Sequence, residues 1–335
     1  MERPSVQVQA EYDSLRQGAG LIDLSACGKL RLGGSARARF LNSLLTHDIL
    51  ALAPGSGCNA LKVTLQGKME AALRVLCLDD ELWCDFDAAA LEGLLRTMRM
   101  RVLRDDVKIE DASVEWSLFS IQGPLARGVF SRLDVDVENL GDMHRNARRV
   151  VAGSEARIVR SDHTGEGGWD VCVLREAGEA VRSVLLAAGA VAVGAEAHDI
   201  RRVEAGIPWH GFEITPDRLP HEAGLDAGWI SYTKGCFFGQ ETIARLHHLG
   251  HVNRNLRRVV FDGHTQLENL RSVLRQPILF EGKEIGTMTS VAFSLALDCA
   301  QGLAYIRRGF DNPESVHVQI GSAPFQVRIA PVPSA

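Results

Sequence analysis

The sequence lacks several features that would assign it at once to a simple class of protein. Its seven cysteines are scattered and include no C-x-x-C pair, which argues against a disulfide framework and against a self-contained zinc or iron–sulfur site. We therefore predict a reducing, cytoplasmic environment and no bound metal. The cysteines are Cys27, Cys58, Cys77, Cys84, Cys172, Cys236 and Cys299.

An excess of charge of one sign is missing too. The chain has 37 Lys and Arg against 42 Asp and Glu, so its net charge of −5 offers no basic field for direct nucleic-acid binding. The longest uncharged run, Ser183 to Ala195, is shorter than the roughly 18 residues that a membrane helix needs. Met1-Glu2-Arg3-Pro4 begins no apolar signal-peptide core. We expect no membrane contact.

Length and patterning predict several folding units. The 335 residues exceed one ordinary domain, and sparse aromatics (6%) with ordinary apolar content (46%) suit an α+β protein. Helices and strands mix in two stretches, which predicts two α+β lobes, 1–114 and 115–248, with interleaving between them. Short alternating strands separated by Gly, Asn and Asp turns follow, and predict an antiparallel β-barrel over 249–332.

Local signals give expectations for single elements. We expect Ser35 to cap a helix whose apolar stripe includes Leu41 and Leu44. The apolar run 229–232 is expected to be a strand. Residues 134–155 show no regular pattern, and we expect them to be irregular.

One stretch carries most of the chemical signal: Lys234-Gly235-Cys236-Phe237-Phe238-Gly239-Gln240-Glu241. A helix should begin near Gln240 and stop at Gly250. Glycines let the chain turn before it, so Cys236 would lie just ahead of a helix N-terminus and two residues from Lys234. Both neighbours favour a thiolate. The alternative is a small buried cysteine in a tight connection.

This stretch closely resembles the signature K-G-C-[YF]-x-G-Q-E of the YgfZ-type folate-binding proteins, which are relatives of the aminomethyltransferase (T-protein) of the glycine cleavage system. A weaker resemblance extends over nearly the whole chain. It implies an α+β, T-protein-like fold: two interleaved ferredoxin-like lobes and a C-terminal antiparallel β-barrel around a central channel. Within the signature it implies the following roles: Cys236 as reactive thiol, Lys234 as its electrostatic activator, Gly235 and Gly239 as shapers of the turn, and Gln240 and Glu241 as helix-start residues.

A second stretch, Thr164 to Asp170, resembles the T-G-E-x-G-[FV]-E segment of aminomethyltransferases, whose final carboxylate faces the pterin ring of folate. Asp170 holds that position here, one methylene shorter than Glu. A carboxylate suits this role because it can accept two N–H donors from the aminopyrimidine edge. Glu166 is expected to support the loop. Without the resemblance, the stretch would be only a hairpin turn.

A third stretch, 198–208, resembles the A-R-D-x-x-R-x-E-A-G-x-P helix of the same enzymes. His198 stands where those enzymes have an arginine that helps to hold folate. The resemblance implies that Arg202 contributes to the folate site, with Asp199 or His198 on the same helix face. The alternative is a surface ion pair that supports the helix, which explains Arg201 better than Arg202.

The turn Gly67-Lys68-Met69-Glu70-Ala71-Ala72 bears on the choice of activity. In aminomethyltransferases the corresponding turn is G-G-x-x-D-D, and one of its aspartates assists one-carbon transfer. Ala71 and Ala72 can neither accept nor donate a proton. Glu70 is adjacent, but successive strand side chains point to opposite faces, so we expect it to be misdirected.

His247, His248 and His251 raise a metal-site alternative. Their H-H-x-x-H spacing lacks the acidic base of a zincin, so solvated or phosphate-facing histidines are favoured.

Three functions remain open. The resemblance implies a tetrahydrofolate-binding accessory protein that supports maturation or repair of iron–sulfur enzymes and, through them, tRNA modification. Its partners would be folate and iron–sulfur client enzymes or assembly proteins. The second is a folate-dependent aminomethyltransferase or methyltransferase, against which Ala71 and Ala72 count. The third is a noncatalytic thiol scaffold or redox sensor that uses Cys236 without folate.

Overall fold

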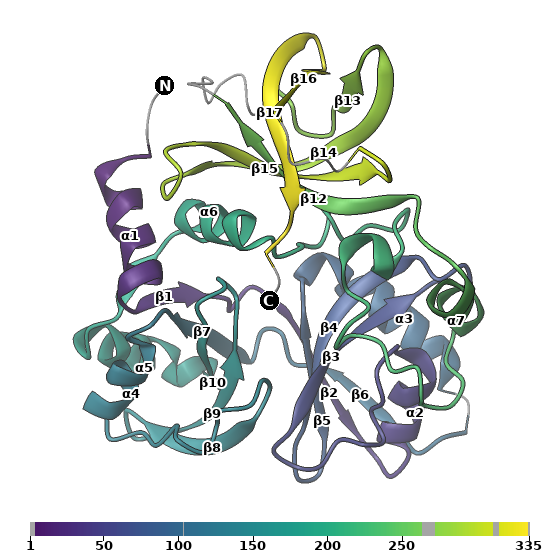
Figure 1. The fold of residues 1–335 in the computed structure, drawn as a ribbon. Coiled ribbons are helices and arrows are strands. Elements are labelled where there is room, and N and C mark those ends of the chain that lie inside the picture. Colours follow the sequence, from purple (N-terminus) through teal and green to yellow (C-terminus); the bar gives the residue numbers. More distant parts are fainter. Residues whose placement is uncertain (1–3, 103, 263–271, 311–314, 334–335) are drawn as a thin grey trace.

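A computed structural model describes residues 4–102, 104–262, 272–310 and 315–333. It confirms the predicted α+β fold with a C-terminal antiparallel barrel. Two sheet-and-helix lobes lie side by side, and the barrel lies across both of them (Figure 1). The last strand runs from the barrel towards the centre of the three bodies, where Val332 packs against buried residues of the first lobe and the barrel.

The first lobe is an antiparallel sheet of order β3-β4-β5-β2-β6. Leu41 and Leu44 of one helix and Leu94 and Met98 of another are buried in its core, as their apolar spacing predicts. The elements are β2 (Gly28–Gly33), α2 (Arg37–Leu44), β3 (Gly57–Val63), β4 (Met69–Cys77), β5 (Leu82–Phe86), the short helix η1 (Ala88–Ala90), α3 (Leu91–Arg101) and β6 (Lys108–Asp111).

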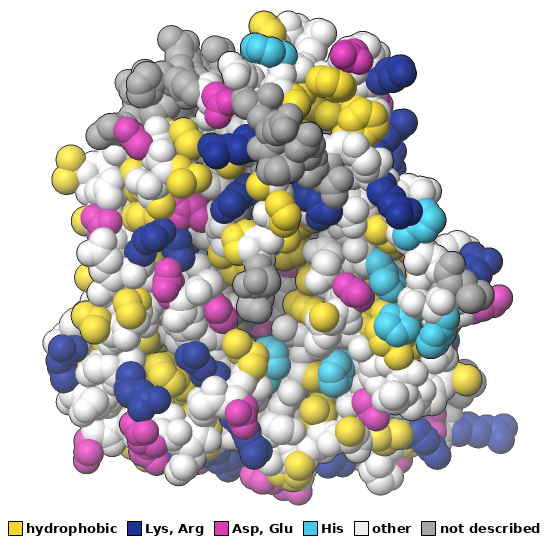
Figure 2. Space-filling view, viewed as in Figure 1, with side chains coloured by type: hydrophobic (Ala, Val, Ile, Leu, Met, Phe, Trp, Pro, Cys, Tyr) yellow, Lys and Arg dark blue, Asp and Glu magenta, His cyan; other side chains and the backbone are white. Residues whose placement is uncertain are grey.

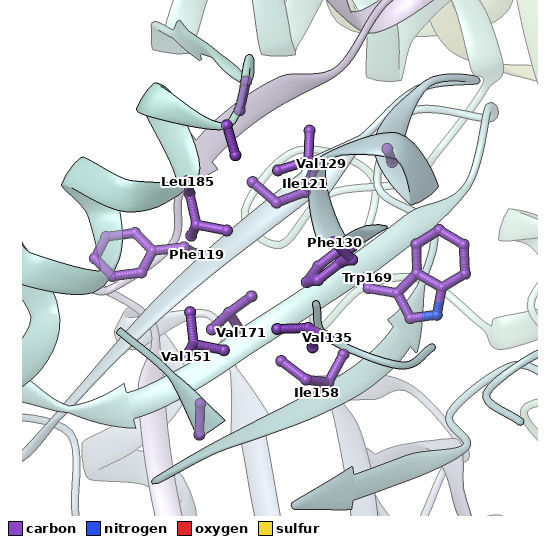
Figure 3. Close-up of a cluster of buried hydrophobic side chains, with 14 of the residues drawn as sticks. Phe119, Ile121, Val129, Phe130, Val135, Val151, Ile158, Trp169, Val171 and Leu185 are labelled. Carbon is purple, nitrogen blue, oxygen red and sulfur yellow. The ribbon is translucent and has the colours of Figure 1, made fainter. Parts of the chain in front are cut away.

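The second lobe is a mixed sheet of order β11-β1-β7-β10-β9-β8. Figure 3 shows its core, where Phe130 meets Trp169 edge to face with ring centroids 5.8 Å apart. The elements are β1 (Gly20–Asp23), β7 (Trp116–Gln122), α4 (Ala126–Arg132), β8 (Asn146–Val151), β9 (Ser154–Ser161), β10 (Gly168–Leu174), α5 (Arg175–Ala187) and β11 (Val191–Val193).

One strand near the N-terminus belongs to the second sheet. Gly20–Asp23 pairs with β7 and β11 of the second sheet before the chain builds the first. The first sheet is thus built from β2 to β6, and the second from β1 and β7 to β11.

The barrel closes in the order β12-β15-β14-β13-β16-β17. Two helices, α1 (Val6–Gln17) and α6 (Ala195–Ala205), pack against each other, and α6 also contacts the barrel strands β14 and β15. The strands are β12 (Arg254–Phe261), β13 (Pro277–Phe280), β14 (Lys283–Ser294), β15 (Cys299–Arg307), β16 (Ser315–Ile320) and β17 (Ala323–Pro331).

Three local predictions were wrong. Residues 229–232 form no strand; instead Thr46 donates from its hydroxyl to the carbonyl of Trp229. Ser35 does not cap α2, because its hydroxyl and backbone N–H both bind the carboxylate of Asp106. The stretch 134–155 contains β8, in which a buried Asn146 and an exposed Val150 break the usual alternation of polar and apolar residues.

The helix predicted after the Lys-Gly-Cys stretch is confirmed as α7 (Gln240–Leu249), which stops at Gly250. Among the helices of the described ranges, none is both long enough and apolar enough to cross a membrane.

Candidate functional site

The Lys-Gly-Cys turn, residues 234–239, leads into α7 and packs against the C-terminal end of α2. The buried ammonium group of Lys234 donates to the carbonyls of Asn42, Leu45 and His47 at 2.6, 2.8 and 2.8 Å. These bonds use all of its donors, and free carbonyls at a helix end favour a cation. Burial lowers the pKa of Lys234 to about 8. The main contacts of Lys234 therefore hold the turn to the first lobe.

Cys236 is exposed at this turn. The buried-cysteine alternative is therefore not what the structure shows. Phe238, two residues further on, is also held in place. Its N–H donates to the carbonyl of Ser43. The ammonium nitrogen of Lys62 and the guanidinium carbon of Arg101 lie 4.9 and 4.1 Å from the centroid of its ring.

The two glycines of the turn differ. Gly239 precedes α7 with φ +86°, and a Cβ there would lie 2.2 Å from the carbonyl oxygen of Thr64, so only glycine fits. Gly235 is exposed, its φ is not in the left-handed region, and a Cβ would meet nothing within 4 Å. Gln240 is the first residue of α7. Glu241 lies in the first turn, where a carboxylate interacts favourably with the positive end of the helix dipole and stabilises the helix.

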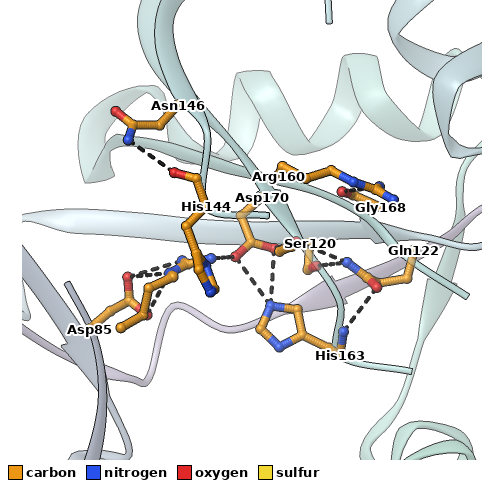
Figure 4. Close-up of polar contacts among 11 residues, drawn as sticks. Asp85, Ser120, Gln122, His144, Asn146, Arg160, His163, Gly168 and Asp170 are labelled. Atoms are coloured by element: carbon orange, nitrogen blue, oxygen red, sulfur yellow. Dashed lines mark hydrogen bonds and ion pairs between the residues drawn. The ribbon is translucent and has the colours of Figure 1, made fainter. Parts of the chain in front are cut away.

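Asp170 lies on β10, fully buried between the two sheets (Figure 4). Its Oδ2 accepts from Nη1 of Arg74 at 2.5 Å, and its Oδ1 accepts from the hydroxyl of Ser161 at 2.7 Å. Nε2 of His163 is 3.1 and 3.2 Å from the two oxygens. Burial alone would raise the pKa of Asp170, but His163 and Arg74 hold it well below its usual range.

Sequence reasoning missed these partners. Arg74 alternates with the buried Leu73 and Val75 on β4, and an arginine inside such a strand signals a buried carboxylate partner elsewhere. Asp85 on β5 provides one, accepting from Nε of Arg74 at 3.0 and 3.1 Å. Asp170, the carboxylate predicted to face the pterin, is thus engaged by protein donors. His163 is its only partly exposed partner among those named, at 30% side-chain exposure.

Arg202 on α6 is also engaged inside the protein. Its guanidinium donates to Asp199 at 2.6 Å, to the fully buried Glu213 at 3.3 Å and to the hydroxyl of Ser290 on β14 at 2.9 Å. The ring of Trp209 lies 5.5 Å from the guanidinium carbon. These contacts tie α6 to the barrel.

His198, one turn earlier on α6, is buried and lies edge to face against Trp209 with centroids 5.1 Å apart. Its Nε2 has no hydrogen-bond partner among the described residues. Burial lowers its pKa to about 4, so the ring is neutral at pH 7.

Glu166 accepts from Nη2 of Arg201 at 2.9 Å, which joins its loop to α6. The same guanidinium donates to the carbonyl of Thr164 and to Glu204. Arg201 is buried, however, so the interpretation of its ion pairs as surface contacts was wrong.

Ala71 and Ala72 lie on β4, where a β-bulge replaces regular pairing. Val63 pairs with Met69 and Lys62 with Ala71, so Glu70 is the extra residue. Its carboxylate pairs with the buried ammonium of Lys62. The bulge and this ion pair, more than simple alternation, set the direction of Glu70.

Histidines gather over α7 and the neighbouring segment (Figure 2). His247 stacks on Tyr232 with centroids 3.6 Å apart, and the Tyr232 hydroxyl lies 2.9 Å from Nε2 of His221. Within the described ranges, no group of three or more His, Cys, Asp or Glu side chains is placed to hold a metal ion.

Fold and site together define a T-protein-like architecture. The family model for the GCVT N-terminal domain matches residues 2–231, and that for the glycine cleavage T-protein C-terminal barrel domain matches residues 256–334. The chain belongs to the glycine cleavage T-protein (GCVT) family.

Similar proteins cover nearly the whole chain. An aminomethyltransferase of Rubrobacter xylanophilus is 30% identical over 97% of this chain and 86% of its own. One of Chloroherpeton thalassium is 28% identical over 97% of this chain and 90% of its own. The crystal structure of the glycine cleavage system aminomethyltransferase T of Bartonella henselae superposes with a TM-score of 0.85 over 97% of this chain and 89% of that one, at 20% identity, which shows a shared fold.

Proposed function

We propose that this chain is a cytoplasmic, tetrahydrofolate-binding accessory protein that supports assembly or repair of iron–sulfur enzymes and, through them, tRNA modification. One observation carries the proposal: the exposed Cys236 stands in a firmly anchored turn, while Ala71 and Ala72 replace the acidic residues of the aminomethyltransferase turn. The chain therefore exposes a thiol and has no acid at the two positions where the aminomethyltransferase turn has aspartates. Its partners are folate and iron–sulfur client or assembly proteins.

The second candidate, aminomethyl or methyl transfer to folate, is favoured by the names of the similar proteins. Glu70 is the adjacent carboxylate, but its Oε2 is held by Lys62, whose side chain is 4% exposed, so turning Glu70 towards another site would break this pair. A buried cation without its partner is costly. We therefore rank this function lower.

A direct test gives purified protein tetrahydrofolate and an aminomethyl-lipoyl carrier protein and measures methylene-tetrahydrofolate. We expect no turnover above the rate without protein. Ala71→Asp and Ala72→Asp are the matched variants: a gain of turnover in either would show that only the acid is missing. Robust turnover by the unaltered chain would refute the accessory role.

The third candidate, a thiol scaffold or redox sensor without folate, is favoured by the internal pairing of Asp170 and Arg202. In the proposal, folate reaches Asp170 by displacing His163, because His163 is its partly exposed partner and Arg74 is buried. His163→Ala should then tighten tetrahydrofolate binding several-fold, and Asp170→Asn should abolish it. Anaerobic calorimetry measures both. No tetrahydrofolate binding by any of the three proteins would leave the scaffold function.

The role of the thiol is tested in cells. In a strain without this protein, the unaltered chain should restore iron–sulfur enzyme activity and tRNA methylthiolation. Cys236→Ser should fail, while Cys299→Ser, which alters a half-buried thiol on the barrel, should succeed. Full rescue by Cys236→Ser would remove the thiol from the mechanism.

A further inference from the structure

A small cleft in the first lobe, close to the Lys-Gly-Cys turn, is a candidate ligand site. It lies between the start of β4 and α3, with a volume of about 160 Å³. For scale, a cavity of about 150 Å³ in another protein accommodates benzene. The cleft is lined by Lys62, Glu70, Ala71, Ala89, Ala90, Gly93, Leu94, Arg96, Thr97 and His210.

The floor and rim of the cleft differ in character. Lys62, Ala71, Ala90 and Leu94 are buried and form the floor, whereas the rim is exposed and includes Arg96. Ala71 and Gly93 present little side chain, which leaves the space open. The cleft therefore has a mostly apolar floor that contains one buried cation, Lys62, and a charged edge.

The polar groups carry both signs of charge. Glu70 is directed to the cleft by the β-bulge, and only its Oε2 bonds to Lys62. Lys62 also donates to the carbonyl of Val63 at 2.7 Å. Nδ1 of His210 is buried and has no hydrogen-bond partner among the described residues. An unpaired buried ring nitrogen signals a missing partner.

We propose that this cleft binds a compact α-amino acid. A carboxylate matches the fork of Arg96, an ammonium matches Oε1 of Glu70, and the small side chain rests on Ala71 and Leu94. Thr97 and His210 line the same cleft. An amino acid can use both groups at once, whereas a ligand of one charge could contact either Arg96 or the second oxygen of Glu70 but not both. This site is separate from the folate function and does not rest on it.

The bound ligand would lie next to the Lys-Gly-Cys turn. Lys62 stands between the two, since its ammonium bonds to Glu70 on the cleft side and lies over the ring of Phe238 on the other. Lys62 therefore contacts both the lining of the cleft and the turn that presents Cys236.

The test uses the full chain and a matched set of probes: L-alanine, propionate, ethylamine and inorganic phosphate. Calorimetry and ligand-observed NMR measure affinity. L-alanine should bind saturably, and the three single-charge probes should bind at least tenfold more weakly. No saturable binding of L-alanine, or equal binding of propionate or phosphate, would overturn the proposal.

A steric variant locates the site without removing a polar group. A Cβ at Gly93 meets nothing within 4 Å, so Gly93→Leu places its side chain in the cleft and replaces a glycine inside a helix by a better helix former. L-alanine affinity should fall at least tenfold. Gly128→Leu makes the same change on α4 of the second lobe and should leave affinity unchanged. An unchanged affinity of the Gly93→Leu variant for L-alanine would show that the ligand binds elsewhere and would refute the proposal.

Discussion

Arg74 on β4 and Asp170 on β10 join the first sheet to the second through a buried ion pair of 2.5 Å, with side-chain exposures of 7% and 0%. Asp85, on the strand next to β4, holds the same guanidinium from the other side. One arginine thus links two carboxylates, one from each lobe. The pair fixes how the two lobes meet. Its carboxylate, Asp170, is the one that the sequence predicted for the folate site.

Removing Arg74 should be costly. Arg74→Met leaves two buried carboxylates without their shared cation, and we expect the free energy of unfolding to fall by about 3–5 kcal/mol. Urea unfolding followed by circular dichroism measures it. Arg127→Met, which breaks an exposed pair with Glu138, is the control and should cost less than about 1 kcal/mol. Similar losses in both variants would contradict the role given to Arg74.

The native protein should contain one fast-reacting thiol. Cys236 is exposed, whereas burial raises the pKa of each of the other six thiols, to about 12 for Cys27, Cys58 and Cys172. A chromogenic disulfide reagent should label one thiol rapidly and the rest only after unfolding. The reaction is run at about pH 7.5, roughly one unit below the pKa of an ordinary thiol. Cys236→Ser should remove the fast phase and leave stability nearly unchanged. A fast phase that persists in this variant would disprove the assignment.

The two glycines of the Lys-Gly-Cys turn should respond in opposite ways to alanine. Gly239→Ala meets both a left-handed φ and the carbonyl of Thr64, so we expect a loss of at least about 2 kcal/mol. Gly235→Ala meets neither and should change stability by less than about 0.5 kcal/mol. Thermal and urea unfolding of the two variants provide the comparison. Equal effects would mean that the turn adopts another conformation.

Stability should fall in mild acid because of buried neutral histidines. The folded pKa of His198 is about 4 and that of His144 about 3, both lowered by burial, against an ordinary value near 6.5. Between these values the unfolded chain binds more protons, so stability is full above about pH 6.5 and falls as pH is lowered towards 4. The depressed pKa of Asp170 affects stability only at still lower pH, where the carboxylates of the unfolded chain take up protons.

A substitution separates the contribution of His198. His198→Phe keeps an aromatic ring against Trp209 and removes the titrating group. The loss of stability between pH 6.5 and 4 should shrink by an amount on the order of 3 kcal/mol, with His144 still contributing. Urea midpoints across this range measure the change. An unchanged pH slope would show that His198 is charged or exposed in the folded protein.

Local sequence determined much of the fold. Apolar spacing placed α7 and the buried face of α2, and alternating strands between turn residues predicted the barrel, because these signals are carried by neighbouring residues. The motif also located the thiol that the structure exposes. Where patterning was weak, as in β8 with its buried Asn146 and exposed Val150, the prediction failed.

Only the tertiary structure decided which groups meet. Lys234 finds its acceptors 187 to 192 positions away, and Arg74 finds Asp170 at a separation of 96. Such pairs depend on how two lobes pack, and no short-range pattern encodes that distance. The same packing places β1 in the second sheet and makes the expected surface arginine of α6 a buried one, since a residue's burial is set by what folds over it.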